Sequence, residues 1–443
     1  MKPALMVNAY DPAEKNTLDA NTAALIARRS RVLGPSYKLF YKNPVHIVRS
    51  EGVWLYDQHG AAYLDVYNNV PAVGHCHPTV VEAVSRQLST LNTHTRYLNE
   101  VVLDYAERLV STFPAALSNV MFTCTGSESS DLALRIARCH TGGTGIIVTE
   151  NAYHGITAAV ADISPSLGDG VPLGLHVRVV PAPNAYHQGE GNTAGLFAEA
   201  VRNAIADLQR HGIRPAALVT DTIFSSDGIY SAPAGFLQDA VTAIREAGGL
   251  FIADEVQPGF GRLGSHMWGF QRHGIVPDLV ILGKPMGNGI PIGGVIAQPE
   301  YLQRFARVAR YFNTFGGNPV SCAAGMAVLD VIQKEGLQHN AAETGQLLIN
   351  GLNTLAQRFP VIGNVRGCGL FIGAEFVSDS TTKTAAGECA LDLVNRLRER
   401  RILISACGKQ SNVLKIRPPL VFSPENAHYL ISVMTDVMEE MFN

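Results

Sequence analysis

Two short apolar runs lie close together in this chain, and a charged residue follows each of them. Residues 250–253 (LFIA) lead into Asp254, and residues 278–283 (DLVILG) lead into Lys284. Short continuous apolar runs are typical of buried parallel strands. Because open α/β sheets bind ligands at the carboxyl ends of their strands, we expect Asp254 and Lys284 to lie at one ligand site.

A lysine and an aspartate placed in this way suit one particular cofactor. A lysine amine condenses with an aldehyde to give a Schiff base. A carboxylate keeps a pyridine nitrogen protonated, so that the ring withdraws electrons from a bound amine. These are the two protein groups that pyridoxal 5′-phosphate (PLP) needs. The alternative is a surface lysine and a loop-capping carboxylate, but the paired strands and the Gly-rich loop 284–289 (KPMGNG) favour the cofactor site.

Three motifs taken together resemble the class III aminotransferases. They are residues 254–264 (DEVQPGFGRLG), Lys284 and residues 313–319 (NTFGGNP). The resemblance covers roughly residues 30–440 and implies the α/β fold of PLP-dependent transferases of fold type I. That fold has a large domain with a mainly parallel sheet and a smaller α+β domain, and the strand–helix alternation from residue 120 onward agrees with it.

The resemblance also implies how the chain is divided into domains. Residues 1–66 would form an arm, a helix and a β-meander that join the small domain. Residues 67–320 would form the large PLP-binding domain, and residues 321–443 the small domain. Near the end of the chain, residues 402–404 and 413–416 are expected to form a strand pair.

The family's pattern assigns roles around the cofactor ring. Lys284 would carry the Schiff base and shuttle protons, and Asp254 would pair with the pyridinium nitrogen. Gln257 would hydrogen-bond the ring 3-hydroxyl. In residues 152–155 (AYHG), the ring of Tyr153 would stack on the pyridine face, and His154 is a weaker candidate for touching substrate.

Two further segments match the parts of the family that bind the cofactor phosphate. Gly126 and Ser127 lie where a predicted strand runs into a helix, and the N–H groups of a helix N-terminus favour a phosphate. Ser129 replaces a common alanine there, which we expect to be harmless. Thr314 resembles the family threonine that reaches the phosphate of the neighbouring subunit. The resemblance therefore implies a homodimer, or a dimer of dimers, with shared active sites.

The chain departs from the family where most members bind a substrate carboxylate. The usual arginine before the C-terminal Pro-Pro pair is Lys415, and the mobile arginine that amine transaminases use is replaced by Ser405. The usual glutamate of the EPxxG loop is replaced by Asp221. These changes argue against a planar carboxylate clamp. A lysine is a point charge and is better matched to a tetrahedral phosphate.

Other segments look most like the phospho-lyase branch of the family. They are residues 67–70 (YNNV) with 74–78 (GHCHP), 91–98 (LNTHTRYL), 283–289 (GKPMGNG) and 414–419 (LKIRPP). Arg96, Lys415 and Arg417 are candidate contacts for a substrate phosphate, although each could equally be a structural surface cation.

Two enzymatic readings follow from these segments. The leading one is a lyase that releases phosphate, ammonia and an aldehyde from a small amine such as ethanolamine phosphate. The alternative is a transaminase of ω-amino acids or amines with pyruvate or glyoxylate as acceptor. A PLP-fold binding module is disfavoured because Lys284 and Asp254 are both present.

Composition limits the remaining possibilities. The net charge of −3, 47% hydrophobic and 16% charged residues fit an enzyme-sized globular protein with no nucleic-acid or membrane partner. The seven cysteines form no C-x-x-C pair, and the N-terminus lacks the apolar core of a signal peptide, so we expect a cytoplasmic protein. Residues 74–78 (GHCHP) resemble a metal site, but their ligands are too close together, and we expect a structural turn without metal.

Overall fold

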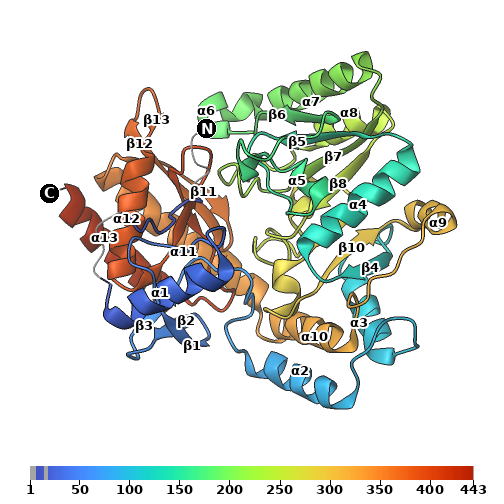
Figure 1. The fold of residues 1–443 in the computed structure, drawn as a ribbon. Coiled ribbons are helices and arrows are strands. Elements are labelled where there is room, and N and C mark those ends of the chain that lie inside the picture. Colours follow the sequence, from blue (N-terminus) through green and yellow to red (C-terminus); the bar gives the residue numbers. More distant parts are fainter. Residues whose placement is uncertain (1–5, 14–17, 443) are drawn as a thin grey trace.

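The computed structural model describes residues 6–13 and 18–442. A large lobe is built around a seven-stranded sheet, and a smaller lobe contains two further sheets from the two ends of the chain (Figure 1). The predicted N-terminal arm, residues 1–18, lies partly outside the described residues. The predicted domain boundaries after residues 66 and 320 remain a prediction.

The seven-stranded sheet has the strand order β4-β10-β9-β8-β7-β5-β6. Its strands are β4 (Asn119–Thr123), β5 (Gly145–Thr149), β6 (Val177–Val180), β7 (Pro215–Asp221), β8 (Leu250–Asp254), β9 (Leu279–Leu282) and β10 (Gly293–Ala297). All are parallel except β10, which runs antiparallel to both β9 and β4. The mainly parallel α/β fold expected from the sequence is confirmed, while β6 and β10 were not predicted.

Helices cover both faces of this sheet, which explains why its strands are apolar without alternation. Phe251 of β8 packs in one core cluster with Val241 of α8 (Gln238–Glu246). The next residue, Ile252, packs in another cluster with Leu132 of α4 (Gly126–Thr141). Further helices of the large lobe are α2 (Pro78–Thr90), α3 (Glu100–Val110), α5 (Ala158–Ala161), α6 (Ala185–Gln188), α7 (Thr193–Arg210) and α9 (Pro299–Val308).

The smaller lobe contains a four-stranded sheet and a five-stranded sheet. The first has the order β1 (Ile47–Glu51), β2 (Trp54–Asp57), β3 (Ala62–Asp65) and β14 (Ile402–Leu403). The second has the order β11 (Ile362–Cys368), β12 (Phe371–Asp379), β16 (Val413–Ile416) and β15 (Ser405–Cys407), with β13 (Thr384–Ala385) paired to β12. The N-terminal and C-terminal segments thus share one lobe.

The predicted pairing of residues 402–404 with residues 413–416 is wrong. β14 pairs in parallel with β3, and it is β15 that pairs with β16. The N–H groups of Leu64 and Val66 donate to the carbonyls of Arg401 and Leu403, so these residues belong to the sheet of β3. The chain then passes to the other sheet at Ile404. The single apolar run 402–407 therefore contributes a strand to each of two sheets, and its sequence pattern does not show where it divides.

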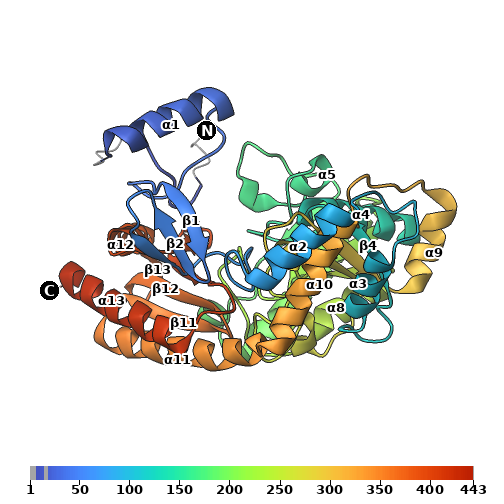
Figure 2. The same ribbon diagram turned by 90° about the horizontal axis from the view of Figure 1, so that it is seen from below.

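The remaining helices connect and flank the lobes. They are α1 (Ala20–Leu33), α10 (Pro319–Lys334), α11 (Leu337–Arg358), α12 (Gly387–Glu399) and α13 (Pro424–Phe442). Figure 2 shows α1 standing away from the body of the small lobe, and only its Thr22 is buried. Across residues 6–13 and 18–442, no helix combines the length and the apolar character that crossing a membrane requires.

Candidate active site

The carboxyl ends of β8 and β9 bring Asp254 and Lys284 together as predicted from the sequence. Asp254 is the last residue of β8, and Lys284 follows β9 after Gly283 and begins a short 3-10 turn. Both residues line one pocket. The same pocket is lined by four other residues predicted as cofactor contacts, namely Gly126, Ser127, Tyr153 and Gln257.

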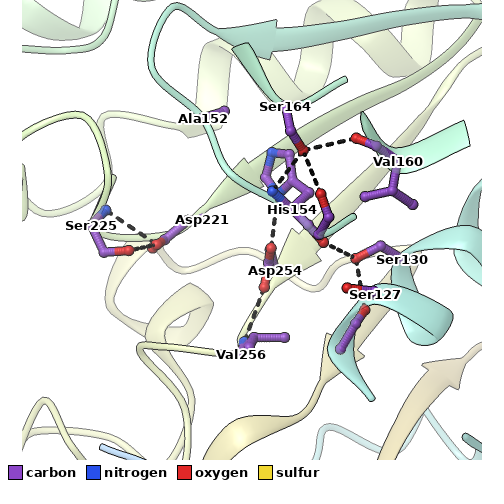
Figure 3. A network of polar contacts seen from close by, with 12 residues as sticks. Ser127, Ser130, Ala152, His154, Val160, Ser164, Asp221, Ser225, Asp254 and Val256 are labelled. Carbon is purple, nitrogen blue, oxygen red and sulfur yellow. Dashed lines mark hydrogen bonds and ion pairs between the residues drawn. The ribbon is translucent and has the colours of Figure 1, made fainter. Parts of the chain in front are cut away.

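Asp254 is held in place by two donors. One carboxylate oxygen accepts the N–H of Val256 at 3.0 Å, and the other lies 2.7 Å from Nδ1 of His154 (Figure 3). Asp254 and His154 are each 4% exposed. The His154 contact was not predicted, since the sequence offered this residue only as a substrate contact. In the structure, the buried ring of His154 contacts the Asp254 carboxylate and orients it.

The backbone of His154 is fixed as well as its ring. Its N–H donates to Ser164 Oγ at 3.0 Å, and its carbonyl accepts from Ser130 Oγ at 2.8 Å (Figure 3). The hydroxyl groups of Ser130 in α4 and of Ser164, just before a short 3-10 helix, therefore hold the loop that carries Tyr153 and His154. No motif reveals such bonds, because the two serines lie 10 and 24 residues from His154 and meet it only in the folded chain.

The phosphate turn predicted at Gly126 and Ser127 is the N-terminus of α4. The side chain of Thr125 caps the helix by accepting the N–H of Glu128 at 3.2 Å. Gly155 lies directly against this turn with φ at +138°, and a Cβ added there would lie 2.5 Å from Ser127 Oγ. The first-turn N–H groups of a helix lack intrahelical partners and attract anions.

Lys284 lies in surroundings that favour its neutral amine. Burial, followed by the positive charge of Arg417, lowers the pKa of Lys284 to about 8, while Asp254 and Asp221 act in the opposite direction. Its Nζ lies 6.0 Å from the ring centroid of Tyr153. A lysine with a lowered pKa is a better nucleophile and proton acceptor near neutral pH.

Asp221 also lines this pocket, at the end of β7 and in register with Asp254 on β8. Its carboxylate accepts the N–H of Ser225 at 3.1 Å and also the hydroxyl of Ser225 (Figure 3). Burial and the nearby charge of Asp254 raise the pKa of Asp221. The residue that replaces the family's usual glutamate is therefore part of the site.

Lys415 of β16 and Arg417 just after it are buried, being 6% and 5% exposed. Lys415 Nζ donates to the carbonyl of Ser225 at 2.9 Å. Arg417 donates to the carbonyl of Tyr67 at 3.0 Å and to the side-chain oxygen of Gln257. Neither residue is a surface cation.

Within the described parts of the chain, no carboxylate forms a salt bridge with Lys415 or Arg417. Burial and the charge of Arg417 lower the pKa of Lys415 to about 7. Burying two cations without a directly paired carboxylate is costly, so this arrangement favours the binding of an anion beside them.

Comparison with known proteins agrees with this geometry. Residues 38–438 match the class-III aminotransferase family. The chain belongs to the class III aminotransferases. Members of this family are PLP-dependent enzymes, and the recognition, the fold and the cofactor expected from the sequence are therefore confirmed.

Similar class III proteins carry both lyase and transaminase names. An alanine–glyoxylate aminotransferase 2-like protein of Drosophila melanogaster is 40% identical over 94% of this chain and 87% of its own length. An ethanolamine-phosphate phospho-lyase homolog of Caenorhabditis elegans is 36% identical over 97% of this chain and 96% of its own length. A phospholyase from Arthrobacter, solved in complex with phosphoethanolamine, has 45% identity and a TM-score of 0.90 over 93% of this chain and 98% of that one.

The residues of this class III protein fit PLP. The N-terminus of α4 provides donors for the phosphate, and Gly155 packs against Ser127 without adding a side chain of its own there. The pair of His154 and Asp254 presents an oriented carboxylate, while Lys284 presents an amine with a lowered pKa. The assignment of each contact to the cofactor remains our proposal.

Four predicted site residues of this class III protein do not line the Lys284 pocket, namely the buried Lys415 and Arg417 and the exposed Arg96 and Thr314. Arg96 is exposed, and its guanidinium stacks 3.8 Å from the ring centroid of Phe312. Thr314 is exposed on the following loop and does not line the Lys284 pocket of its own chain. Both positions are open to contact from another molecule.

The GHCHP turn makes contacts within the protein. His75 lies 2.7 Å from Asp65, and His77 lies 3.0 Å from Glu335. No group of three or more potential ligands for a metal ion is found in the portion of the chain that the structure describes.

Proposed function

We propose that this class III protein is a phospho-lyase acting on a small primary amine that carries a phosphate on the neighbouring carbon. Ethanolamine phosphate is the simplest such substrate, and its products with water would be acetaldehyde, ammonia and phosphate. The observation that carries the proposal is the pair of buried cations, Lys415 and Arg417, which interact electrostatically with Lys284. They offer a site for a phosphate anion.

Bound PLP supplies an aldehyde that takes up the substrate amine and a ring that withdraws electrons from it. Asp254, oriented by His154, holds the proton at the ring nitrogen. Lys284 Nζ removes a proton from the substrate carbon next to the nitrogen. Its pKa of about 8 suits this exchange near neutral pH.

The cations act on the bond that breaks next. As the bond between carbon and the phosphate oxygen breaks, its electron pair stays with the phosphate. Lys415 and Arg417 stabilise the charge that develops there, and such stabilisation accelerates a step only where charge appears in the transition state. A substrate without this leaving group would instead be directed towards transamination.

The names of the relatives support the phospho-lyase proposal, and some of them also support one alternative function. The Arthrobacter phospholyase and the Caenorhabditis phospho-lyase homolog match over nearly the whole chain. The Drosophila protein named an aminotransferase is similarly related, and so is an alanine–glyoxylate aminotransferase 2 homolog of Arabidopsis thaliana at 38% identity. The alternative is therefore a transaminase of amines or ω-amino acids with pyruvate or glyoxylate as acceptor.

Product analysis separates the two functions. The PLP-loaded protein is incubated with ethanolamine phosphate and assayed for inorganic phosphate and ammonia, beside an amine with pyruvate or glyoxylate. We expect phosphate release, with transamination as a slower side activity. Efficient transamination without phosphate release would support the alternative.

Single substitutions then test the cations. Lys415→Ala and Arg417→Ala should slow phosphate release by about 100-fold or more, as loss of a transition-state contact does. Half-transamination of a simple amine should change much less. Lys409→Ala is the matched control, because Lys409 lies just beyond β15 but is exposed and pairs with Glu150.

The proposal includes a homodimer whose active sites are shared. Thr314 and Phe315 are exposed beside a cavity of about 390 Å³ lined mainly by apolar residues such as Leu103 and Phe312. Large exposed apolar patches favour a protein partner, and symmetric dimers are the commonest assembly. Thr314 would then reach the cofactor phosphate of the neighbouring subunit.

Sedimentation equilibrium of the purified protein tests this assembly, and a fully active monomer would contradict it. Mixed dimers provide a sharper test. A Lys284→Ala subunit and a Thr314→Ala subunit should together form one intact site if the site is shared. Activity above that of either variant alone is the expected result.

A further inference from the structure

Two adjacent serines near the start of α4 are fully buried but do not line the Lys284 pocket. Ser129 Oγ lies 3.0 Å from the carbonyl oxygen of Leu282, the last residue of β9. Ser130 Oγ lies 2.8 Å from the carbonyl oxygen of His154. The helix that begins at the phosphate turn is thus bonded to the segment that precedes Lys284 and to the loop that carries Tyr153 and His154.

The Ser129 hydroxyl has one hydrogen and three neighbouring oxygens. Besides Leu282, these are the carbonyl of Thr125 at 3.0 Å and the hydroxyl of Thr123 at 2.7 Å. The Thr125 carbonyl already accepts the helical N–H of Ser129 at 3.0 Å. Thr123 can supply the hydrogen of its own contact with Ser129. This leaves the Ser129 hydrogen for the carbonyls of Thr125 and Leu282. Leu282 lies two residues before Lys284 and is the only one of the two outside the turn of α4 itself.

Two glycines show how closely these segments approach each other. A Cβ added to Gly293 of β10 would lie 2.7 Å from Ser129 Oγ, so only glycine leaves room for this hydroxyl. A Cβ added to Gly283 would lie 3.0 Å from both the nitrogen and the Cα of Gly126. The backbone before Lys284 thus lies directly on the phosphate turn, and the Ser129 hydroxyl bonds the same two segments.

We propose that Ser129, through a bond that the family's common alanine cannot make, is a positioning residue of this chain that fixes Lys284 relative to the phosphate turn at Gly126. A cofactor held by its phosphate then has its aldehyde placed at the Lys284 amine, since fixed geometry accelerates a reaction between two bound groups. With alanine at position 129, only the backbone contact between Gly283 and Gly126 would connect the Lys284 segment to the phosphate turn. The proposal rests on the roles proposed above for Lys284 and Gly126.

The test compares PLP with pyridoxal, which has the aldehyde but lacks the phosphate. Apoprotein is mixed with each compound, the Lys284 adduct is trapped with borohydride at successive times, and its amount is measured by mass spectrometry. In the wild type the phosphate should accelerate capture strongly. In Ser129→Ala the ratio of the PLP rate to the pyridoxal rate should fall by about threefold to tenfold, the range expected for losing one buried hydrogen bond.

Three further variants separate the possible outcomes. Thr344→Ala removes a buried helical hydroxyl of α11 far along the chain and should keep the wild-type ratio despite a similar loss of stability. Ser129→Cys keeps a weak donor and should restore part of the ratio. A Ser129→Ala ratio equal to that of the wild type would overturn the inference. Labelling that persists in Lys284→Ala would instead show that the proposed site itself is wrong.

Discussion

Nδ1 of His154 lies 2.7 Å from Oδ2 of Asp254, and both side chains are removed from solvent. Replacement of His154 by alanine would leave Asp254 with the N–H of Val256 as its other donor. We expect the dissociation constant for PLP to rise about tenfold to hundredfold, the loss typical of a buried hydrogen bond to a charged group.

Asparagine places a donor near the position of Nδ1, so His154→Asn should retain more affinity than His154→Ala. Spectrophotometric titration of the apoproteins with PLP measures both constants. Equal constants for the wild type and His154→Ala would show that the histidine does not support the carboxylate.

Lys284→Ala should abolish the covalent attachment of PLP, because its amine is the proposed Schiff-base group at the end of β9. Borohydride treatment of the loaded protein followed by peptide mapping provides the measurement. Lys415→Ala serves as the control and should keep the label on Lys284. An adduct mapped to a different lysine would contradict the assignment.

Anion binding should weaken as the pH rises through the pKa of Lys415, which burial and Arg417 lower to about 7. A protonated amine attracts an anion and a neutral amine does not, so binding is accompanied by proton uptake above that pKa. Sulfate is a suitable probe because its own charge is constant from about pH 6 to pH 9. Its affinity should fall by up to about tenfold per pH unit above the pKa.

Lys415→Met should remove most of the pH dependence of sulfate affinity. Any pH dependence that remains would come from other titrating groups. Inhibition of phosphate release by sulfate at several pH values gives the affinities for the wild type, and displacement of a bound anionic dye gives them for the variant. A wild-type affinity that is constant across this range would show that Lys415 does not hold the anion.

Gly155→Ala should damage the phosphate turn. The added Cβ would lie 2.5 Å from Ser127 Oγ, and φ at +138° is a conformation that residues with side chains rarely adopt. We expect a loss of about 1–3 kcal/mol in the free energy of unfolding, together with weaker PLP binding. Gly170→Ala is the control, since nothing lies within 4 Å of a Cβ there. Denaturant titration and PLP titration measure the two effects.

Much of the fold could be predicted from local pattern. The apolar runs before Asp254 and Lys284 predicted two buried strands correctly, because burial on both faces leaves a continuous apolar signature. The direction of β10 could not be predicted, since its run GGVIA is equally suited to either orientation. The same limit applies to residues 402–407, where hydrogen bonds to β3 divide one run between two sheets.

The candidate site shows a similar division. Motifs identified Asp254, Lys284 and Tyr153, because each carries chemistry that its residue type indicates. The contact of His154 with Asp254 and the burial of Lys415 depend on packing between distant segments. Sequence alone left Lys415 and Arg417 as possible surface cations, and only the fold shows that they are enclosed.

Lys284 and the proposed phosphate-binding cations stand on different sheets, the former after β9 and the latter around β16. In our proposal, proton transfer and the handling of the leaving group are therefore encoded in separate parts of the gene. A mutation at Lys415 can change which substrates react while Lys284 and Asp254 are inherited unchanged, whereas Arg417 also acts on Lys284 and donates to Gln257. Separate inheritance of the Lys415 position offers a route by which one ancestral scaffold could diverge into lyases and transaminases.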